Sequence, residues 1–415
     1  MSKFGLKILL YSKDGIRLGH LRRNVNIAHE LSRLLPDTKF LFITDSPITH
    51  FFRLPINSTL LKLPTLVKID EGLYTTISKK ISNLNYISIK RSRAIREVVQ
   101  QFSPNIFLVE HLPKGALGEL TETLAYIRMN SPQTNTILGL RDIIGASETI
   151  VSHWRSEDIY STMSEYYDLI IIYGCKDIYD PVAEYDFPEE LRQKTRYCSY
   201  VCNGFIEDPI SNTQFNSMFS KKRPFKVLVE GGGGSDAYFL MDVMLDAISY
   251  LGNAVTFNTF MIAGPFMPSE ERRNLIRRSE GLPVVVKHMD KDSLKYLEHA
   301  DLVVSMAGYN TVCEILKFGK KAIVIPRSGQ GEEQKTRGRI FENLGLVSTI
   351  TPENLGPKIL AERILHKLNE KHKLYWNNVP NLNGASYTAR LLLEQFYTDS
   401  IVQRKSLVNN MFKFI

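Results

Sequence analysis

Short apolar runs alternate with longer amphipathic stretches along most of the chain. The short runs are almost continuously apolar, which is typical of strands buried on both faces of a parallel sheet. In the stretches between them, apolar residues recur every three or four positions, which predicts helices. In the first half the pattern predicts strands at Lys7–Ser12, Lys39–Asp45, Thr59–Leu63, Asn105–His111, Thr136–Arg141 and Leu169–Gly174, and helices at Gly19–Leu35, Ser92–Phe102, Gly115–Asn130 and Ser156–Tyr166.

The alternation stops between residues 207 and 224 and then resumes. This segment holds Asp208-Pro209, several Asn and Ser residues and a basic run before Pro224, which are features of a linker. After it the pattern predicts strands at Lys226–Glu230, Thr256–Ala263, Val284–His288, Leu302–Ser305 and Ala322–Pro326, and helices at Tyr238–Leu251, Ser269–Ser279, Asp292–His299, Tyr309–Phe318, Glu333–Leu344 and Ala385–Phe396.

A chain of 415 residues is too long for one ordinary core, so two domains are expected. The alternation predicts an α/β protein with two doubly wound, Rossmann-like domains. We place the first at residues 1–206, the linker at 207–224 and the second at 225–380. Residues 381–415 are predicted to form a C-terminal helix and a basic tail.

Composition limits the classes of partner, compartment and cofactor to be expected for this protein. The chain is 43% hydrophobic and 23% charged, as in ordinary globular proteins, and its net charge of +8 suits anionic small molecules. No zinc-finger spacing or aromatic RNA-binding strand is present, so we expect no nucleic-acid partner. The four cysteines form no CxxC pair, and no signal peptide or membrane-length apolar run is seen, so we expect a cytoplasmic protein. Because no acidic pair follows a strand, we expect no metal or other cofactor.

Two loops of the second half resemble phosphate-binding turns. Gly231, Gly232, Gly233, Gly234 and Ser235 follow a predicted strand, and bare glycine N–H groups can approach an anionic ligand closely. A plain glycine-rich turn is the alternative. The second loop runs from Ser305 to Gly308 and opens a helix at Tyr309, Asn310 and Thr311, whose N–H groups can face a diphosphate.

Glu314 lies about one turn into that helix, where its carboxylate can accept two hydrogen bonds from the cis-diol of a ribose. An acidic residue that only complements the helix dipole is the alternative. Farther on, Glu333 and Gln334 can read sugar hydroxyls, or Glu333 can cap its helix. Arg327 can pair with a phosphate or form a surface salt bridge.

His20 is the candidate catalytic residue of the first half. It lies near a predicted helix start, where the positive helix end favours the neutral imidazole that a general base requires. Gly19 keeps the loop open, and Arg22 and Arg23 add positive charge. A capping or buried structural histidine is the alternative. His111 ends a predicted strand and is a further candidate in the same cleft.

These motifs resemble those of GT-B glycosyltransferases, in the branch of the bacterial lipid II N-acetylglucosaminyltransferase and the plant galactolipid synthases. They are most similar to a group of predicted glycosyltransferases. The shared motifs are Gly19–Arg23, Gly139–Asp142 with Arg141, Tyr173-Gly174, Pro326-Arg327 and Glu332–Gln334. The resemblance runs from Lys7 to about Phe396 and is most specific between Ser305 and Gln334.

The resemblance implies a GT-B fold whose C-terminal helix crosses back to the N-terminal domain. It also implies that Glu314 holds the ribose, that backbone near Met289 reads the uracil and that Gln334 touches the donor sugar. The glycine loops would bind the diphosphate, and His20 would be the base. The chain departs from the lipid II enzymes at Arg17-Leu18-Gly19-His20, where they have a glycine-rich loop, and at Tyr309-Asn310, where they have small apolar residues.

The resulting hypothesis is a metal-independent, inverting glycosyltransferase. It would move a hexose or N-acetylhexosamine from a nucleoside-diphosphate sugar, expected to be a UDP-sugar, to a hydroxyl acceptor. The predicted donor side comprises Gly231, Gly232, Gly233, Gly234, Ser235, Met289, Ser305, Gly308, Tyr309, Asn310, Thr311, Glu314, Arg327, Glu333 and Gln334. The predicted acceptor side comprises Gly19, Arg22, Arg23, His111 and Arg141 beside His20.

Two alternatives stay open. The Gly19-His20 motif also resembles a nucleotide-sugar hydrolase in which the histidine activates water, although that enzyme is much shorter. The protein can also be a nucleotide-sugar sensor without catalysis. Separately, the basic residues Lys79, Lys80, Lys90, Arg91, Arg93 and Arg96, and the basic, apolar tail ending at Ile415, suggest peripheral contact with the inner membrane face. A solvated helix and a docked tail are the alternative.

Overall fold

The chain folds into two compact units in a computed structural model that describes residues 5–70, 73–76, 83–202, 206, 208–219, 223–329, 331–371 and 376–411. The first unit comprises Met1–Gly15, Gly19–Val201 and Asn383–Ile415, and the second comprises Ile16–Leu18 and Cys202–Leu382. The predicted linker at 207–224 lies shortly after the chain passes from the first unit to the second between Val201 and Cys202, and its residues 207 and 220–222 lie outside the described residues.

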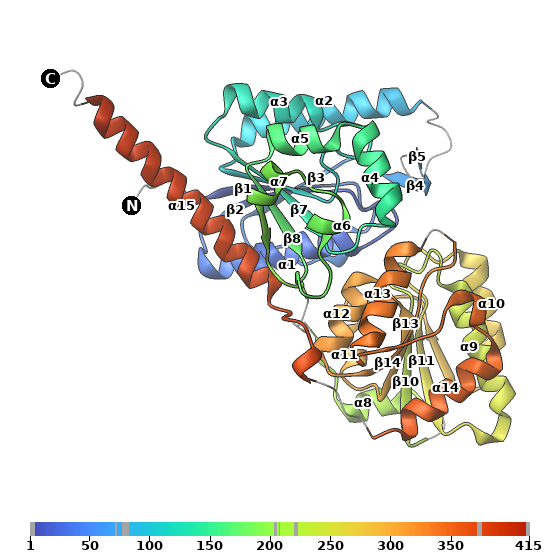
Figure 1. The fold of residues 1–415 in the computed structure, drawn as a ribbon. Helices are drawn as coiled ribbons and strands as arrows, with labels where there is room; N and C mark the ends of the chain where they lie inside the picture. Colours follow the sequence, from blue (N-terminus) through green and yellow to red (C-terminus); the bar gives the residue numbers. More distant parts are fainter. Residues whose placement is uncertain are drawn as a thin grey trace. The chain divides into compact units, whose positions relative to one another are not determined.

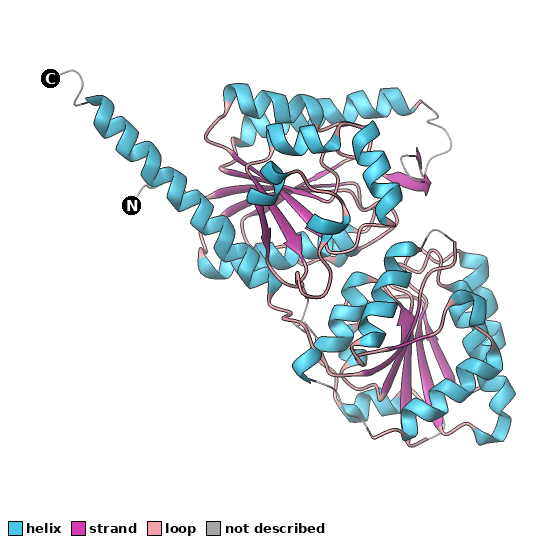
Figure 2. Ribbon diagram, in the orientation of Figure 1, coloured by secondary structure: helices cyan, strands magenta, loops and turns pink. Residues whose placement is uncertain are grey.

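The first unit is built on a seven-stranded parallel sheet with the order β3-β2-β1-β6-β7-β8-β9. Helices cover both of its faces (Figures 1 and 2). The strands are β1 (Lys7–Ser12), β2 (Lys39–Thr44), β3 (Ser58–Lys62), β6 (Ile106–Glu110), β7 (Asn135–Arg141), β8 (Leu169–Tyr173) and β9 (Thr195–Tyr197), with a separate antiparallel pair β4 (Leu66–Asp70) and β5 (Leu73–Thr76). The helices are α1 (Gly19–Leu34), α2 (Leu84–Phe102), α3 (Thr121–Asn130), α4 (Ser147–Ser156), α5 (Ile159–Tyr166), α6 (Pro181–Glu184) and α7 (Glu189–Gln193).

The central strands are buried because helices cover them on both faces. Every residue from Ile8 to Tyr11 and from Ile106 to Val109 is buried, as the continuous apolar runs predicted. The edge strand β3 is largely exposed instead, which fits its position at the end of the sheet. The carboxyl ends of these parallel strands lie at one edge of the sheet, where ligand sites form in open α/β folds.

The second unit repeats the plan with a six-stranded parallel sheet in the order β12-β11-β10-β13-β14-β15. Its strands are β10 (Phe225–Glu230), β11 (Phe257–Ile262), β12 (Val284–Lys287), β13 (Leu302–Met306), β14 (Lys321–Ile325) and β15 (Ser348–Thr349). Its helices are α8 (Asn212–Ser217), α9 (Tyr238–Leu251), α10 (Ser269–Ser279), α11 (Leu294–Leu297), α12 (Tyr309–Lys317), α13 (Glu332–Asn343) and α14 (Pro357–Asn369). The two doubly wound Rossmann-like domains predicted from the alternation are therefore confirmed.

The C-terminal helix α15 (Gly384–Met411) belongs to the first unit although it follows the second in sequence. It begins just after the chain leaves the second unit at Leu382, and it packs against α1, as Figure 1 shows. Ser386 donates a hydrogen bond to Glu30, and Thr388 donates one to Cys198. The predicted return of the last helix to the N-terminal domain is confirmed.

Several predicted boundaries were wrong. Helix α2 starts at Leu84 rather than Ser92, because Asn83 caps it by accepting a hydrogen bond from the Tyr86 N–H. Helix α3 starts at Thr121 rather than Gly115, and α15 continues well past Phe396. Helices α4 and α14 had no predicted counterpart. Among the described residues, no helix is both long and apolar enough to cross a membrane.

Candidate active site

The first unit brings together the carboxyl ends of β6, β7 and β8 and the start of α1. His20 is the second residue of α1, and its side chain is only 12% exposed. Its Nδ1 lies 3.1 Å from Glu110 Oε1, at the end of β6. The two imidazole rings of His20 and His111 stack with centroids 5.0 Å apart. Three predicted residues, His20, Arg23 and His111, therefore form one cluster.

Glu110 is the centre of this cluster, and sequence reasoning missed it. Its side chain is completely buried, and its Oε1 accepts hydrogen bonds from Arg23 Nε (2.9 Å) and Arg23 Nη2 (2.6 Å). Burial raises the pKa of Glu110, while the charge of Arg23 opposes that shift. The signal available in the sequence was an acidic residue directly at the end of a buried strand.

The orientation of His20 follows from its two neighbours. Arg23 Nη2 lies 2.9 Å from His20 Nδ1, so Nδ1 either accepts from Arg23 or donates to Glu110. When His20 takes up a proton, both ring nitrogens donate, and of these two neighbours Glu110 is the one that can accept from Nδ1–H. A carboxylate in that position stabilises the imidazolium and leaves Nε2 as the proton-accepting nitrogen, the arrangement of an activated base.

Gly139, Tyr173 and Arg141 complete the cluster from β7 and β8. A Cβ at Gly139 would lie 2.1 Å from the Tyr173 hydroxyl, so only glycine leaves room for that buried tyrosine. The Arg23 guanidinium lies 5.9 Å from the Tyr173 ring centroid. Arg141 Nη2 lies 3.2 Å from His111 Nε2, and His111 itself adopts the left-handed backbone conformation at φ 72°.

A buried carboxylate occupies the start of α1. Asp14 accepts hydrogen bonds from the backbone N–H groups of His20 (3.1 Å) and Leu21 (3.0 Å). Burial, reinforced by the charge of Asp45, raises the pKa of Asp14 to about 7. A side chain of the protein therefore accepts two of the N–H groups at the start of the helix that carries His20.

Asp45 in turn fixes the loop that carries Asp14. Its Oδ1 accepts from the N–H groups of Asp14 (2.7 Å) and Gly15 (2.8 Å), and Oδ2 accepts from Leu66 N–H. Gly19 and Arg22, also predicted on the acceptor side, lie in the first turn of α1, half-buried. The buried pair of aspartates is a second feature that sequence reasoning missed.

In the second unit the glycine loop follows β10 as predicted, and two of its glycines have packing reasons of their own. A Cβ added at Gly231 would lie 2.0 Å from Ala237 Cβ. A Cβ added at Gly234 would lie 2.2 Å from the Ala263 carbonyl oxygen. Gly232, at φ 61°, has open space beside it, so the packing that requires glycine at those two positions does not apply here. Ser235 donates a hydrogen bond to Asp236 at the end of this loop.

The loop after β13 also forms the predicted turn. Gly308 is the N-cap residue of α12, so that Tyr309, Asn310 and Thr311 make up its first turn. Ser305 is buried, and its hydroxyl has no hydrogen-bond partner in the described part of the chain.

Glu314 is the sixth residue of α12, beyond its first turn, and its side chain is buried. Burying a carboxylate is costly unless charged or hydrogen-bonding groups surround it. Met289 follows β12 in a half-buried loop. That loop is fixed by Asp290, which contacts Lys287 Nζ (2.6 Å), Lys295 Nζ (3.1 Å) and the Tyr296 hydroxyl (2.7 Å).

The residues around the start of α13 pair with one another. Arg327 forms an ion pair with Asp236, which is the salt-bridge alternative left open by the sequence. The Gln334 carbonyl accepts a hydrogen bond from Arg327 N–H (3.0 Å), and Glu333 Oε1 lies 2.9 Å from Arg337 Nη1. No side-chain hydrogen bond caps α13, so Glu333 is not its cap. Sequence reasoning missed Arg337.

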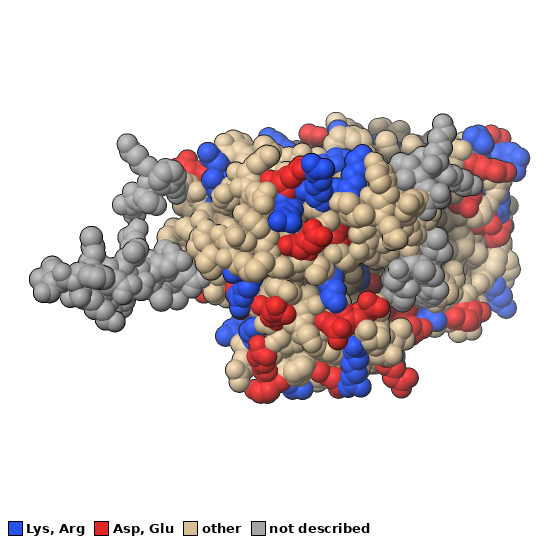
Figure 3. Space-filling view, turned by 90° about the horizontal axis from the view of Figure 1, so that it is seen from above, with Lys and Arg blue, Asp and Glu red and all other residues tan. Residues whose placement is uncertain are grey.

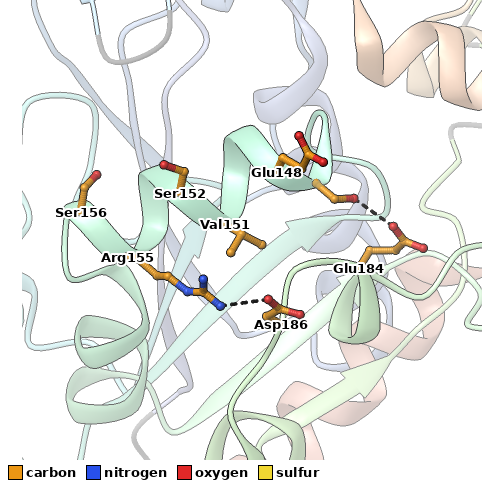
Figure 4. Close-up of a pocket in the computed structure, with 8 residues that line it drawn as sticks. Glu148, Val151, Ser152, Arg155, Ser156, Glu184 and Asp186 are labelled. Carbon is orange, nitrogen blue, oxygen red and sulfur yellow. Dashed lines mark hydrogen bonds and ion pairs between the residues drawn. The ribbon is translucent and has the colours of Figure 1, made fainter.

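An open polar groove between α4 and α6 of the first unit lies apart from all of these residues (Figure 4). Arg155 pairs with Asp186 across it, and Ser147 donates a hydrogen bond to Glu184. None of the predicted site residues lines the groove. The groove is therefore not part of the candidate site.

Comparison with known proteins identifies the fold. Residues 227–389 match the glycosyltransferase family 28 C-terminal domain, a range that holds every predicted donor residue. The crystal structure of Acinetobacter baumannii MurG superposes on 93% of this chain and 95% of its own with a TM-score of 0.54 at 12% identity. TcCGT1 in complex with UDP superposes on 98% of this chain and 100% of its own with a TM-score of 0.62 at 12% identity. The chain has the GT-B glycosyltransferase fold.

Sequence relatives of this GT-B chain match part of it. The UDP-N-acetylglucosamine–N-acetylmuramyl-(pentapeptide) pyrophosphoryl-undecaprenol N-acetylglucosamine transferase of Thermodesulfovibrio yellowstonii is 29% identical over 137 residues, 32% of this chain. The chain spans 36% of the length of that relative, and 40 to 42% of two similar ones. The GT-B fold predicted from the motifs is confirmed, and the roles of the individual site residues stay predictions.

Proposed function

We propose that the protein is a glycosyltransferase that moves a sugar from a nucleoside-diphosphate sugar to a hydroxyl acceptor. The observation that carries this proposal is the match of residues 227–389 to the family 28 C-terminal domain. That range contains the glycine loop, the α12 turn, Glu314 and the α13 start, which were predicted to bind the donor. The same range also contains the buried Ser305 hydroxyl, near the end of β13, which has no hydrogen-bond partner in the described part of the chain.

The donor is proposed to be a UDP-sugar carrying a hexose or N-acetylhexosamine. Support comes from the names of similar proteins, which include a UDP-N-acetylglucosamine-dependent transferase and a UDP complex. The name of the relative also includes an undecaprenol-linked acceptor, so lipid-linked sugars are the first acceptors to test.

In the proposed mechanism His20 removes the proton from the acceptor hydroxyl through Nε2 as the hydroxyl attacks the anomeric carbon. The bond from that carbon to the diphosphate breaks, and the diphosphate leaves with the electron pair. Glu110 then stabilises the imidazolium through Nδ1–H, at 3.1 Å. Direct attack of this kind inverts the anomeric centre.

We also propose that the transfer needs no metal. The N–H groups at the start of α12 and the glycine loop can stabilise the leaving diphosphate in place of a cation.

Contact with the cytoplasmic face of the inner membrane is part of the proposal, with one revision. Arg91 is fully buried and paired with Glu119, so it cannot face a membrane. On the same helix, Tyr86, Ile89, Lys90 and Arg93 are exposed. Figure 3 shows basic and acidic side chains interspersed on the face that it displays. Lys79, Lys80 and residues 412–415 lie outside the described residues.

One experiment tests the proposed activity and separates it from the alternatives. The full chain is incubated with UDP-glucose or UDP-N-acetylglucosamine, with and without a lipid-linked sugar acceptor, and the products are identified by mass spectrometry. A transferase releases UDP faster when acceptor is added and gives a glycosylated acceptor. Release of free sugar or sugar phosphate without acceptor would indicate the hydrolase, and binding without turnover would indicate the sensor.

A further inference from the structure

Arg337 of α13 is a buried cation for which the proposed site has no role so far. Its side chain is 1% exposed. Its Nη1 donates hydrogen bonds to Glu333 Oε1 (2.9 Å) and to the Ala307 carbonyl (3.2 Å). Its guanidinium lies 5.6 Å from the centroid of the Tyr309 ring. All of these residues belong to the second unit.

The partners of Arg337 come from two parts of the predicted donor site. Glu333 was predicted to read sugar hydroxyls, whereas Ala307 and Tyr309 flank Gly308, the turn predicted to receive the diphosphate. A buried guanidinium is stable only when its surroundings pair with it, so its contacts are geometrically demanding. Both hydrogen bonds come from Nη1, whose two N–H directions are fixed by the planar guanidinium, whereas the ammonium group of lysine rotates about its bond.

We propose that Arg337 is a positioning residue that fixes Glu333 relative to the diphosphate-binding turn, so that the sugar and the diphosphate of the donor are recognised together. This inference rests on the proposed function. The bond to Arg337 uses Oε1 of Glu333, and an ionised carboxylate has about four acceptor sites, so the same group can also accept from sugar hydroxyls. The ion pair thus orients the Glu333 carboxylate.

The positioning role differs measurably from a merely structural one. A structural arginine supports the whole site, so its loss weakens UDP and UDP-sugar binding alike. A residue that orients Glu333 affects the sugar contact most, because UDP has no sugar for Glu333 to bind. The informative quantity is therefore the ratio of the UDP dissociation constant to that of the UDP-sugar.

The experiment measures that ratio by calorimetry with UDP, UDP-glucose and UDP-N-acetylglucosamine for the full chain and for Arg337→Gln, Arg337→Lys and Glu333→Gln. Arg339→Gln is the matched control, because Arg339 is exposed on the same helix. Loss of a charge-assisted hydrogen bond corresponds to about tenfold or more in affinity. We expect the ratio to fall by about that factor in the Arg337 variants and in Glu333→Gln, and to stay at the wild-type value in the control.

Coupling between the two residues gives a second readout. In the double variant Arg337→Gln with Glu333→Gln, the ratio should fall no further than in Glu333→Gln, since both changes remove the same contact. Arg337→Lys keeps the buried positive charge. If Arg337→Gln does not fold, the ratio is therefore measured with Arg337→Lys instead. An unchanged ratio in the folded Arg337 variants, or an equal loss for UDP and UDP-sugar, would overturn the inference alone. A wild-type chain that binds no nucleotide sugar would refute the proposed function and this inference with it.

Discussion

At the scale of single residues, the candidate site depends on how two side chains with opposite requirements meet at the end of β6. His20 needs a neighbour that stabilises its protonated form, and Glu110 needs cationic partners because it is buried. Arg23 and His20 together supply those partners within 3.1 Å. The cluster thus satisfies a buried carboxylate and orients a base at the same time.

Replacement of Glu110 by Gln should lower turnover by about 10²-fold, the lower end of the range for general acid–base catalysis. The amide keeps the shape of the side chain but cannot stabilise the His20 imidazolium. Initial rates with saturating donor and acceptor measure the effect, and UDP affinity is the control. His20→Ala should lose about as much turnover with unchanged donor affinity, and wild-type turnover in His20→Ala would make that histidine structural.

Glu314→Ala should weaken UDP binding by about tenfold or more, since charge-assisted hydrogen bonds to the ribose are worth roughly 1.5–3 kcal/mol. Calorimetric titration with UDP measures the change. Because Glu314 is buried, a thermal unfolding curve must accompany it to show that the variant is folded. Equal UDP affinity in a folded variant would rule out the ribose role.

At the scale of elements, helix α1 depends on a cap whose charge varies with pH. Asp14 accepts from two backbone N–H groups of the first turn, but burial and Asp45 raise its pKa to about 7. An unfolded aspartate has a pKa of about 3.9, so the folded protein binds more protons between about pH 4 and pH 7. The contribution of Asp14 to stability therefore decreases as the pH rises through that window.

Asp14→Asn should flatten this decline, because asparagine still accepts the capping hydrogen bonds and carries no charge. Asp14→Ala should lose about 1 kcal/mol of unfolding free energy through loss of the cap. Urea unfolding across the window from about pH 4 to pH 7 measures both. Asp290→Asn is the contrasting control: the pKa of Asp290 is lowered to about 2, chiefly by Lys287 and Tyr296 against the effect of burial, so its stabilisation is lost only in more acidic solution. An Asp14→Asn variant whose stability declines as steeply as that of the wild type would contradict the assignment.

At the scale of the whole molecule, the proposed metal-free transfer predicts full activity in excess chelator. The diphosphate would be stabilised by backbone N–H groups of the second unit, which chelation leaves unaffected. Rates with and without EDTA, after extensive dialysis, measure this. Activity that disappears with EDTA and returns with Mg²⁺ or Mn²⁺ would contradict the proposal.

Membrane contact also belongs to the whole molecule. The exposed face of α2 carries Tyr86 and Ile89 beside the basic Lys90, and also Arg93, which pairs with Glu97 of the same helix. Each basic group near an anionic surface contributes about 1 kcal/mol at low salt. We expect the full chain to cosediment with anionic liposomes at low salt and to be released at high salt. Equal recovery in the supernatant with and without liposomes at low salt would exclude the contact.

The sequence by itself determined the two parallel sheets, because strands buried on both faces must be continuously apolar and helices between them must be amphipathic. It also identified the loops at the strand ends, where Gly231–Gly234 and Gly308 interrupt the pattern. Helix α14 could also have been predicted from the sequence. Pro357 lies in the first turn of this helix, and Leu360, Ala361, Ile364 and Leu368 have the spacing of one buried helix face. The start of α2 was not predicted, because Tyr86 and Ile89 are apolar residues on its exposed face and weaken the amphipathic pattern there.

Only the tertiary structure decided which polar side chains meet. Glu110 lies 90 residues from His20, and the two become neighbours because β6 pairs directly with β1 in the sheet. Asp14 and Asp45 meet for the same reason at the ends of β1 and β2. Arg337 reaches Ala307 across the junction of α13 with the α12 turn. Hydrophobic periodicity is local and therefore readable from the chain, whereas the pairing of buried charges depends on strand order, which periodicity does not encode.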